Sequence, residues 1–337
     1  WSVAGLGDAN GDGYEDVAVG SPEYGGTGRV QVFHGASGGA DAVADAQITG
    51  VAGSELGYAV AGAGDVNRDG YADLIAGAPG FSDGQTGEGL VALYPGGPSG
   101  IAQTLSWTAQ LNQSGAALGS AVGSADVNGD GFSDLIAGAP FYDDGRTNNG
   151  RVVVFHGGLG VPSSTPDWST FGSYDVDAAM GTAVASAGDL NGDGYEDVIF
   201  GAPGAYLSTL ANAGLAEVWY GSGSGLGGVA GQQFLGSSAG DMLGSAVGTA
   251  GDVNGDGYAD VFVGAPGMEA STQTIDSGCV RVWHGSATGV GVTKDWQVCG
   301  SQGGAAFGTS AAATDANGDG FADLLVGAPL WDQGQSD

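Results

Sequence analysis

Six copies of one nine-residue acidic loop recur along the chain and hold the residues best suited to chemistry. Each copy has Asp, Asn, Asp and Asp at its positions 1, 3, 5 and 9, and Gly at position 6. A hard cation such as Ca²⁺ takes several oxygen ligands at about 2.3–2.6 Å from a chain that curls around it, and Gly permits the sharp turn that this path needs. The spacing therefore predicts one calcium site in each loop.

We expect five protein ligands in each loop, namely the four side chains and the backbone carbonyl of the aromatic residue at position 7. The expected ligands are Asp8, Asn10, Asp12, Tyr14, Asp16; Asp65, Asn67, Asp69, Tyr71, Asp73; Asp126, Asn128, Asp130, Phe132, Asp134; Asp189, Asn191, Asp193, Tyr195, Asp197; Asp252, Asn254, Asp256, Tyr258, Asp260; and Asp315, Asn317, Asp319, Phe321, Asp323. The expected cofactor is calcium, at about six ions per chain. The loops lack His and Cys, which argues against zinc or copper, and magnesium prefers a tighter octahedron that retains water.

Two other interpretations of these acidic loops are weaker. A single Asp-x-Asn-Gly-Asp-Gly segment is also typical of an ordinary turn. Six copies with three acids at fixed offsets are harder to explain in that way, because carboxylates within ~4 Å repel by a few kcal/mol per pair at an effective dielectric near 20. An EF-hand would need Glu at position 12 of the loop, where this chain has Val, Ala or Phe. Arg68 lies between two ligands of the second loop, and we expect it to point outward and to weaken that site.

The first residues of successive loops are 57 to 63 positions apart, which indicates a repeat architecture. Each unit has a short apolar run before its loop, such as 56–62, and a second run that ends in Gly-Ala-Pro, such as 73–79. A third run such as 150–157 and a weaker fourth such as 167–172 follow, and no helical pattern occurs. Four short antiparallel strands per unit favour a β-propeller, in which sheet edges are protected. A linear solenoid of β-units is the alternative, although capping repeats are not evident.

We therefore predict an all-β fold, a single β-propeller domain of four-stranded antiparallel blades that spans residues 1–337. The expected units are about 1–50, 51–112, 113–172, 173–236, 237–300 and 301–337, the last of them incomplete.

Three submotifs recur in one order: Leu-Gly or Phe-Gly, then Asp-x-Asn-Gly-Asp-Gly, then Gly-Ala-Pro. This order resembles FG-GAP repeats, which build the β-propeller head of integrin α-chains and many bacterial surface proteins. The resemblance covers essentially the whole chain. It implies a seven-bladed propeller in the full protein, of which six units are visible here, with calcium in the loop between the first and second strands. The chain departs from the integrin pattern because all six units keep a full loop.

The connections after Gly-Ala-Pro should gather on the face opposite the calcium loops, because successive strands alternate in direction. They vary in length and sequence, and variable loops on a rigid scaffold are common binding sites. Integrin-like propellers use this face for ligands and partner subunits, so the resemblance implies an adhesion module that binds a protein or carbohydrate ligand here. The alternative without a binding role is that these connections are solvated loops with occasional hydrophobic tips. The candidate ligand-face residues are Tyr24, Phe81, Tyr142, Asp143, Arg146, Tyr206 and Trp331.

Catalysis has little support in the sequence, and we expect no enzyme. His34, His156 and His284 occupy one repeat position at which Pro95 and Tyr220 stand in other units, so they are structural variation. Carboxylate pairs outside the acidic loops, such as Asp143 and Asp144, leave one alternative open. That alternative is a polysaccharide-active lyase or glycosidase on a calcium-stabilised propeller.

The chain has 337 residues and a formal net charge of −32, from 38 acidic and only six basic residues. Such a surface should repel nucleic acid and anionic membranes, so we expect neither as a partner. Since no apolar run approaches the ~18 residues of a membrane span, we expect no membrane insertion. Calcium sites of extracellular affinity favour a secreted or cell-surface protein. Cys279 and Cys299 fall on the third and fourth runs of one unit, where a cross-strand disulfide is plausible but not required.

Overall fold

The computed structural model describes residues 1–40, 42–172, 176–270 and 275–332. Regular structure in these ranges is β-sheet, apart from one short 3-10 turn, η1 (Tyr24–Gly26). The chain divides into two compact units, which we describe separately. Unit 1 comprises residues 1–126 and 130–171, and unit 2 comprises residues 127–129 and 172–337.

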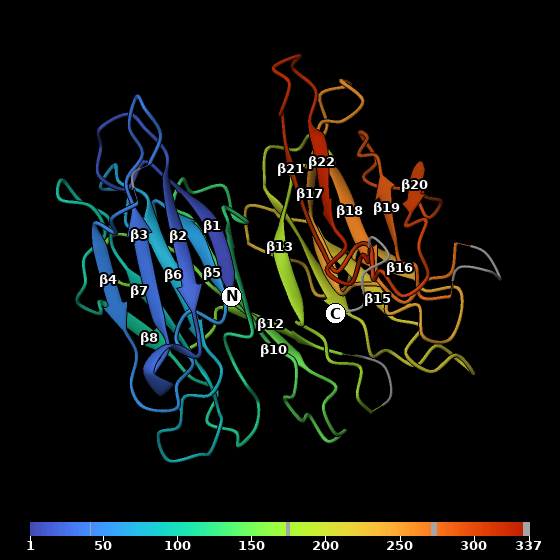
Figure 1. Ribbon diagram of the computed structural model, residues 1–337, viewed down its shortest axis with the longest axis horizontal. Coiled ribbons are helices and arrows are strands. Elements are labelled where there is room, and N and C mark those ends of the chain that lie inside the picture. The colour runs from blue at the N-terminus through green and yellow to red at the C-terminus, as the bar shows by residue number, and fades with distance from the viewer. Residues whose placement is uncertain (41, 173–175, 271–274, 333–337) are drawn as a thin grey trace. The chain divides into compact units, whose positions relative to one another are not determined.

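Each unit is built from blades, numbered one to six along the chain (Figure 1). Unit 1 holds blade one, with β1 (Ser2–Gly7), β2 (Asp16–Ser21), β3 (Arg29–Phe33) and β4 (Ala46–Thr49); blade two, with β5 (Val60–Gly64), β6 (Asp73–Ala78), β7 (Leu90–Tyr94) and β8 (Trp107–Ala109); and blade three, with β9 (Ala121–Ala125), β10 (Asp134–Ala139), β11 (Arg151–Phe155) and β12 (Trp168–Phe171). Unit 2 holds blade four, with β13 (Ala183–Gly188), β14 (Asp197–Ala202), β15 (Leu215–Trp219) and β16 (Gln232–Leu235); blade five, with β17 (Ala246–Gly251), β18 (Asp260–Ala265), β19 (Cys279–Trp283) and β20 (Trp296–Cys299); and blade six, with β21 (Ser310–Thr314) and β22 (Asp323–Gly327).

Five of these blades are four-stranded sheets whose strands follow chain order, and all neighbours are antiparallel. The second strands are the most buried: all six residues of β6, β10, β14 and β18 are buried. Within each unit, neighbouring blades contact each other chiefly through their first strands: β1 packs on β5 and β5 on β9, and β13 packs on β17 and β17 on β21. This packing suits radial blades better than a linear solenoid. The predicted all-β fold of four-stranded propeller blades is confirmed.

Two features of the first strand differ from the sequence prediction. The run 56–62 was expected to be a strand, but β5 begins only at Val60. Leu56 is buried, and its N–H donates to the carbonyl of Thr27 in the preceding blade (3.3 Å). Its apolar side chain therefore anchors a turn between blades, which a period-2 pattern cannot distinguish from a strand. A second feature is a β-bulge next to the acidic loop, for example at Gly7 (φ 80°).

The glycines of two recurring submotifs meet between neighbouring blades. A Cβ atom on Gly77, in the Gly-Ala-Pro motif of blade two, would overlap the backbone oxygen of Gly119 in the Leu-Gly motif of blade three. Gly20 and Gly57 are related in the same way in blades one and two. The backbones approach too closely for a side chain, so both submotifs require Gly at these positions.

We expect Gly77→Ala to destabilise the protein by about 3 kcal/mol, because the new methyl group meets backbone that cannot move aside. Gly5→Ala is the matched control, since a Cβ on this β1 residue meets nothing within 4 Å. Urea unfolding followed by circular dichroism measures both variants. Equal midpoints for the two variants would show that the close approach does not constrain the fold.

One cross-strand disulfide joins β19 to β20. Cys279 and Cys299 are direct register partners with Cα atoms 4.0 Å apart, and their sulfur atoms are bonded. The pairing left open by the sequence is therefore formed. Among the described residues, no helix is both long enough and apolar enough to cross a membrane.

Candidate functional site

The first carboxylate of each acidic loop organises the turn around itself. Asp8 Oδ1 accepts hydrogen bonds from the N–H groups of Gly11 (2.7 Å) and Asp12 (3.1 Å), and its Oδ2 accepts one from Gly13 (2.8 Å). Asp189, Asp252 and Asp315 make the same three bonds in their own loops. Bonds to backbone N–H groups, above all that of Gly13, lower the pKa of Asp8. The loop is thus shaped around an ionised first residue.

The third and fifth residues continue this curl. Asn10 Nδ2 donates to Asp12 Oδ2 (2.9 Å), while Asn10 Oδ1 accepts the N–H of Asp12 (2.9 Å). Asp12 Oδ1 then accepts the N–H of Tyr14 (3.0 Å). All three bonds recur in the second, fourth and fifth loops. The predicted ligands at positions 1, 3 and 5 therefore lie along one tight turn.

The ninth residue ties the loop to the rest of its blade. Asp16 is fully buried, and its Oδ2 accepts the N–H of Ala9 (3.0 Å) while Oδ1 accepts the N–H of Gly35, just after β3 (2.8 Å). Asp73, Asp197 and Asp260 make the equivalent pair of bonds. One carboxylate thereby joins the start of the loop to the end of the third strand.

Burial disfavours the ionised form of two of these ninth-position carboxylates. It raises the pKa of Asp73 to about 6, and repulsion from Asp69 and Asp65 adds to the increase. Burial likewise raises the pKa of Asp197 to about 7, with repulsion from the other two acids of its loop. These groups would be stabilised as anions by a nearby cation.

The donor chemistry of the loops fits calcium, although the side chains are not arranged as a closed cage. In the part of the chain that the structure describes, no group of three or more His, Cys, Asp or Glu side chains forms a metal cluster. Each carboxylate instead accepts backbone N–H groups. A carboxylate has about four lone-pair positions, so Asp8, Asp12 and Asp16 all keep acceptor capacity beyond those bonds. All donors are oxygens, as a hard cation requires.

The acidic loops of blades one, two, four and five are each bonded to the next blade of their unit. The backbone carbonyl of Asp8 accepts the N–H of Ala72 (3.1 Å), and that of Ala9 accepts the N–H of Gly97 (3.0 Å). The ring of Tyr71 lies against Gly11, where a Cβ atom would be only 2.8 Å from it. Equivalent bonds join the fourth loop to blade five through Asp189–Ala259 and Leu190–Ser286. These bonds link each of these loops to the neighbouring blade, and Gly at position 4 makes room for the neighbour's aromatic ring.

The second loop has Arg68 where most loops have this Gly. Its side chain leaves its own loop and reaches the third one, with Nη1 3.4 Å from the carbonyl oxygen of Asp130. The guanidinium carbon lies 5.6 Å from the ring centroid of Phe132. The outward direction expected for Arg68 is what the structure shows, while its effect on metal affinity stays a prediction.

The candidate ligand-face residues differ in exposure and in their surroundings. Tyr24 is exposed in η1 with Arg29 stacked on it, 3.8 Å from guanidinium carbon to ring centroid. Tyr142 is half-buried beside Arg151 and Phe171, with the Arg151 guanidinium carbon 5.1 Å from its ring centroid. Phe81 packs on the core of blades one and two, whereas Arg146 is exposed in unit 1 and Tyr206 and Trp331 are exposed in unit 2.

Asp143 and Asp144 make hydrogen bonds to nearby loop residues. The N–H of Asp143 donates to Gln113 Oε1 (2.6 Å), and Asp143 Oδ1 accepts the N–H of Asn148 (2.7 Å). Asp144 Oδ1 accepts a bond from Asn149 Nδ2 (2.8 Å). These bonds give both carboxylates a structural role and weaken the alternative of a catalytic pair.

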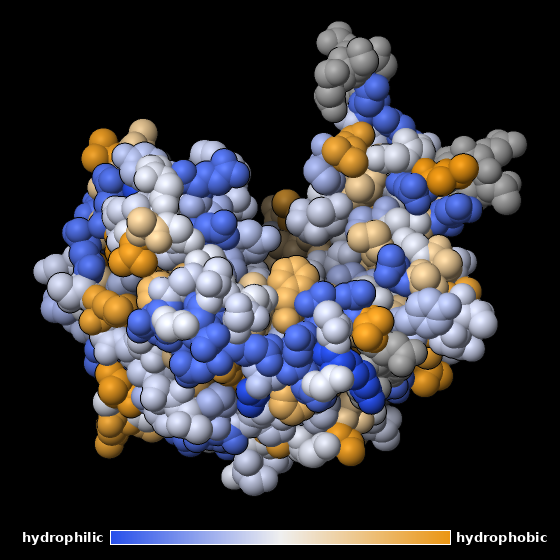
Figure 2. Space-filling view, turned by 90° about the horizontal axis from the view of Figure 1, so that it is seen from below, coloured by the Kyte–Doolittle hydropathy of each residue, from blue (hydrophilic) through white to orange (hydrophobic). Residues whose placement is uncertain are grey.

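Two arginines that the sequence analysis did not name are further candidates for ligand contacts. Arg29 and Arg151 each begin a third strand and each stack on an aromatic side chain of the preceding connection. The repeated Gly-Arg-Val at 28–30 and 150–152 was the available signal. Figure 2 shows the molecule from the side on which the short coil of η1 lies in Figure 1. In this view of unit 1, hydrophobic residues appear as separate spots among hydrophilic ones. The part of unit 1 seen in this view is therefore not one continuous apolar patch.

Comparison with known proteins adds an independent finding. The FG-GAP repeat family matches residues 1–33, 56–94, 118–155, 180–219, 243–273 and 307–337. Similar relatives include integrin alpha-4 of Xenopus laevis, 33% identical over 216 residues that cover 63% of this chain and 20% of the relative. Integrin alpha-V of Gallus gallus is 30% identical over 227 residues, covering 65% of this chain and 21% of the relative. The chain spans only about a fifth of the length of these relatives.

Proposed function

Because the chain belongs to the FG-GAP repeat family, we propose that it is a calcium-stabilised, ligand-binding module of the integrin α type, acting at the cell surface or outside the cell. The observation that carries this proposal is the similarity to integrin alpha chains over the same repeats that contain the acidic loops. We propose an adhesive role and no catalysis.

In this proposal, calcium stabilises the folded blades and takes no part in catalysis. Its expected ligands are the side chains at positions 1, 3, 5 and 9 and the carbonyl at position 7 of each loop, as set out above. The loops contain 18 of the 38 acidic residues, so six divalent cations would change the net charge from −32 to −20 (−32 + 12). In blades one, two, four and five, the bonds from the acidic loop to the next blade would let an ordered loop stabilise two blades.

The ligand is proposed to be a protein, bound by the connections after the second strands. Support comes from the exposed Tyr24 with Arg29 and the half-buried Tyr142 with Arg151, since aromatic and arginine side chains are enriched among residues that dominate protein interfaces. A carbohydrate ligand is the second possibility retained from the sequence.

We expect the double variant Tyr24→Ala, Tyr142→Ala to weaken adhesion at least about tenfold, the effect of losing about 1.4 kcal/mol of binding energy. Beads that carry the protein would be tested on surfaces coated with extracellular-matrix protein, neutral polysaccharide or acidic polysaccharide. Tyr14→Ala is the matched control, because this tyrosine is similarly exposed but lies in an acidic loop, where its expected role as a ligand uses only the backbone carbonyl that the substitution keeps.

Three results would contradict parts of this proposal. Adhesion by the double variant equal to that of the parent protein would remove these tyrosines from the interface. Adhesion to polysaccharide alone would assign the ligand to the carbohydrate class. Release of soluble sugar products would favour the polysaccharide-active enzyme instead.

A further inference from the structure

A groove of about 400 Å³ lies between blades one and two of unit 1, both of which are complete four-stranded sheets. Its floor is apolar and comes from both blades: Ile48 of β4, and Leu90, Ala92 and Tyr94 of β7. Its rim on the side of blade two carries amide and hydroxyl groups, those of Gln103, Thr108 and Gln110. The groove therefore combines apolar surface with uncharged hydrogen-bonding groups.

The groove is open because blade two has shorter side chains where other blades have arginine. Leu90 of β7 occupies the register position of Arg151 in blade three, and Ala92 occupies that of Arg281 in blade five. Arg281 reaches across to blade four, where its guanidinium donates to the carbonyl oxygen of Leu235 at 3.5 Å. The space that an arginine fills between blades four and five is therefore open between blades one and two.

One buried polar group that lines the groove has no partner. Tyr94 is 5% exposed, and its hydroxyl makes no hydrogen bond to any residue that the structure describes. Burial alone raises the pKa of this phenol to about 12, so it stays protonated and can donate at neutral pH. Blades one and three have phenylalanine at this register position, Phe33 and Phe155. Since a buried hydroxyl without a partner costs free energy, a ligand that accepts its proton would recover that cost.

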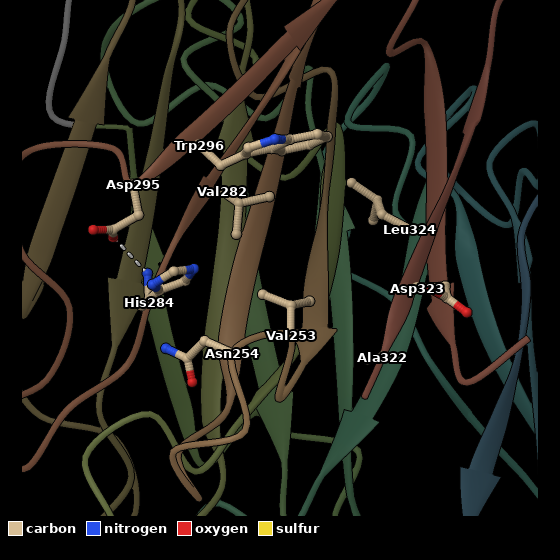
Figure 3. A pocket seen from close by; sticks show the side chains of 9 residues that line it. All are labelled: Val253, Asn254, Val282, His284, Asp295, Trp296, Ala322, Asp323 and Leu324. Carbon is tan, nitrogen blue, oxygen red and sulfur yellow. Dashed lines mark hydrogen bonds between the residues drawn. The ribbon is translucent and has the colours of Figure 1, made fainter. Parts of the chain in front are cut away.

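The lining of the groove is uncharged, although the chain as a whole has a formal net charge of −32. Among the described residues that line it, none is Asp, Glu, Lys, Arg or His. A pocket of the same volume in unit 2 differs in this respect, because His284, Asp295 and Asp323 line it (Figure 3). In the groove of unit 1 a cation would find no carboxylate to pair with, and an anion would be repelled by the acidic molecule. The groove therefore selects an uncharged ligand.

We propose that this groove binds one neutral sugar unit of an oligosaccharide. The C–H face of the sugar ring lies on the apolar floor, and its hydroxyl groups bond to Thr108 and Gln110 and accept the hydroxyl proton of Tyr94. Hydroxyl and amide side chains both donate and accept, which matches the hydroxyl groups of a sugar. The groove volume lies within the range of about 300–1,000 Å³ that is usual for ligand pockets.

Two other uses of the groove fit its lining less well. An apolar peptide side chain would cover the floor but would offer no acceptor to Tyr94. Cleavage of a sugar would need a pair of carboxylates, and none lines the groove, so the sugar is bound and not hydrolysed. The site does not include Tyr24 or Tyr142, and the inference does not depend on the proposed function.

The test titrates the chain of residues 1–337, in calcium-containing buffer, with neutral trisaccharides of glucose, galactose, mannose and N-acetylglucosamine, followed by calorimetry. The trisaccharide of galacturonic acid is the charged comparison. We expect saturable binding of at least one neutral trisaccharide, and at least about tenfold weaker binding of the charged one. Ala92→Arg introduces the side chain that blade five has at this register position and should abolish binding. Tyr94→Phe removes the hydroxyl alone and should weaken binding about three- to tenfold.

Tyr58→Phe is the matched control, because it makes the same chemical change on an exposed tyrosine of unit 1 that does not line the groove. The double variant Tyr24→Ala, Tyr142→Ala should keep the full sugar affinity, which separates this site from the proposed adhesive contacts. Circular dichroism establishes that each variant is folded before it is titrated.

The proposal is overturned if no neutral trisaccharide binds the folded parent protein, or if the charged trisaccharide binds equally well. Sugar affinity that neither Ala92→Arg nor Tyr94→Phe changes would place the sugar outside the groove and would equally overturn it. Binding of a blocked Gly-Leu-Leu-Gly peptide in place of every sugar would assign the groove to a protein partner.

Discussion

Removal of calcium is expected to lower the unfolding midpoint of this protein by tens of degrees, and elemental analysis of the calcium-loaded protein should find about six ions per chain. The comparison is a thermal melt in millimolar calcium against the same melt in excess EDTA. The reason lies in the acidic loops, which hold three aspartates each within one tight turn.

The size of the effect follows from binding linkage. One site occupied at 100 times its dissociation constant adds about 2.7 kcal/mol to the free energy of unfolding. Several such sites exceed the usual 5–15 kcal/mol stability of a domain, so calcium could decide whether the blades fold at all. The loop-to-blade bonds, such as Ala72 N–H to Asp8 carbonyl, make neighbouring sites interdependent, so the loss should be cooperative.

Single-site variants test whether calcium acts in these loops. Asp12→Ala or Asp256→Ala should lower the midpoint in calcium but change it little in EDTA, because each carboxylate bonds mainly within its own loop. Asp143→Ala is a control that removes a carboxylate from a loop without predicted calcium. Unchanged melting of all loop variants in calcium, or the absence of bound metal, would reduce the six loops to ordinary turns.

The repeat, the strand class and the loops could be predicted from sequence because each depends on local patterns. Alternating apolar residues specify the third strands, and Asp, Asn and Gly at fixed offsets specify the turn that Asp8 closes on Gly11 and Gly13. The recurring glycines of the submotifs also reflect contacts between blades. Gly77 and Gly119 are glycines because the backbones of two neighbouring blades approach each other closely there.

What could not be predicted depends on distance in space. Leu56 looked like a strand residue but anchors a turn on the preceding blade, and pattern alone does not reveal the partner. Asp143 looked available for ligand or catalysis, but Gln113, 30 residues earlier, binds its backbone. Arg29 and Arg151 stack on Tyr24 and Tyr142, and the sequence spacing alone does not reveal these contacts. Pairing of Cys279 with Cys299 required the register of β19 on β20.

The calcium-free protein should become less stable as pH rises from about 4 to about 7, and calcium should remove most of this dependence. In the folded state without metal, burial raises the pKa of Asp73 to about 6 and that of Asp197 to about 7, against 3.8 for an ordinary aspartate. The folded state therefore binds protons more strongly than the unfolded state throughout this window. Below pH 4 both states are protonated at these positions and the penalty is absent, whereas above pH 7 both are ionised and it is complete.

Each pKa unit corresponds to about 1.36 kcal/mol, so these two carboxylates together should cost several kcal/mol after allowance for screening by solvent near the loops. Calcium reverses the preference because it favours the ionised form. Urea unfolding at pH 4.5, 6 and 7.5, with and without calcium, measures both slopes. A calcium-free protein that gains stability across this range, or equal slopes in the two buffers, would mean that the buried aspartates are already compensated by their backbone N–H partners and that calcium does not act through them.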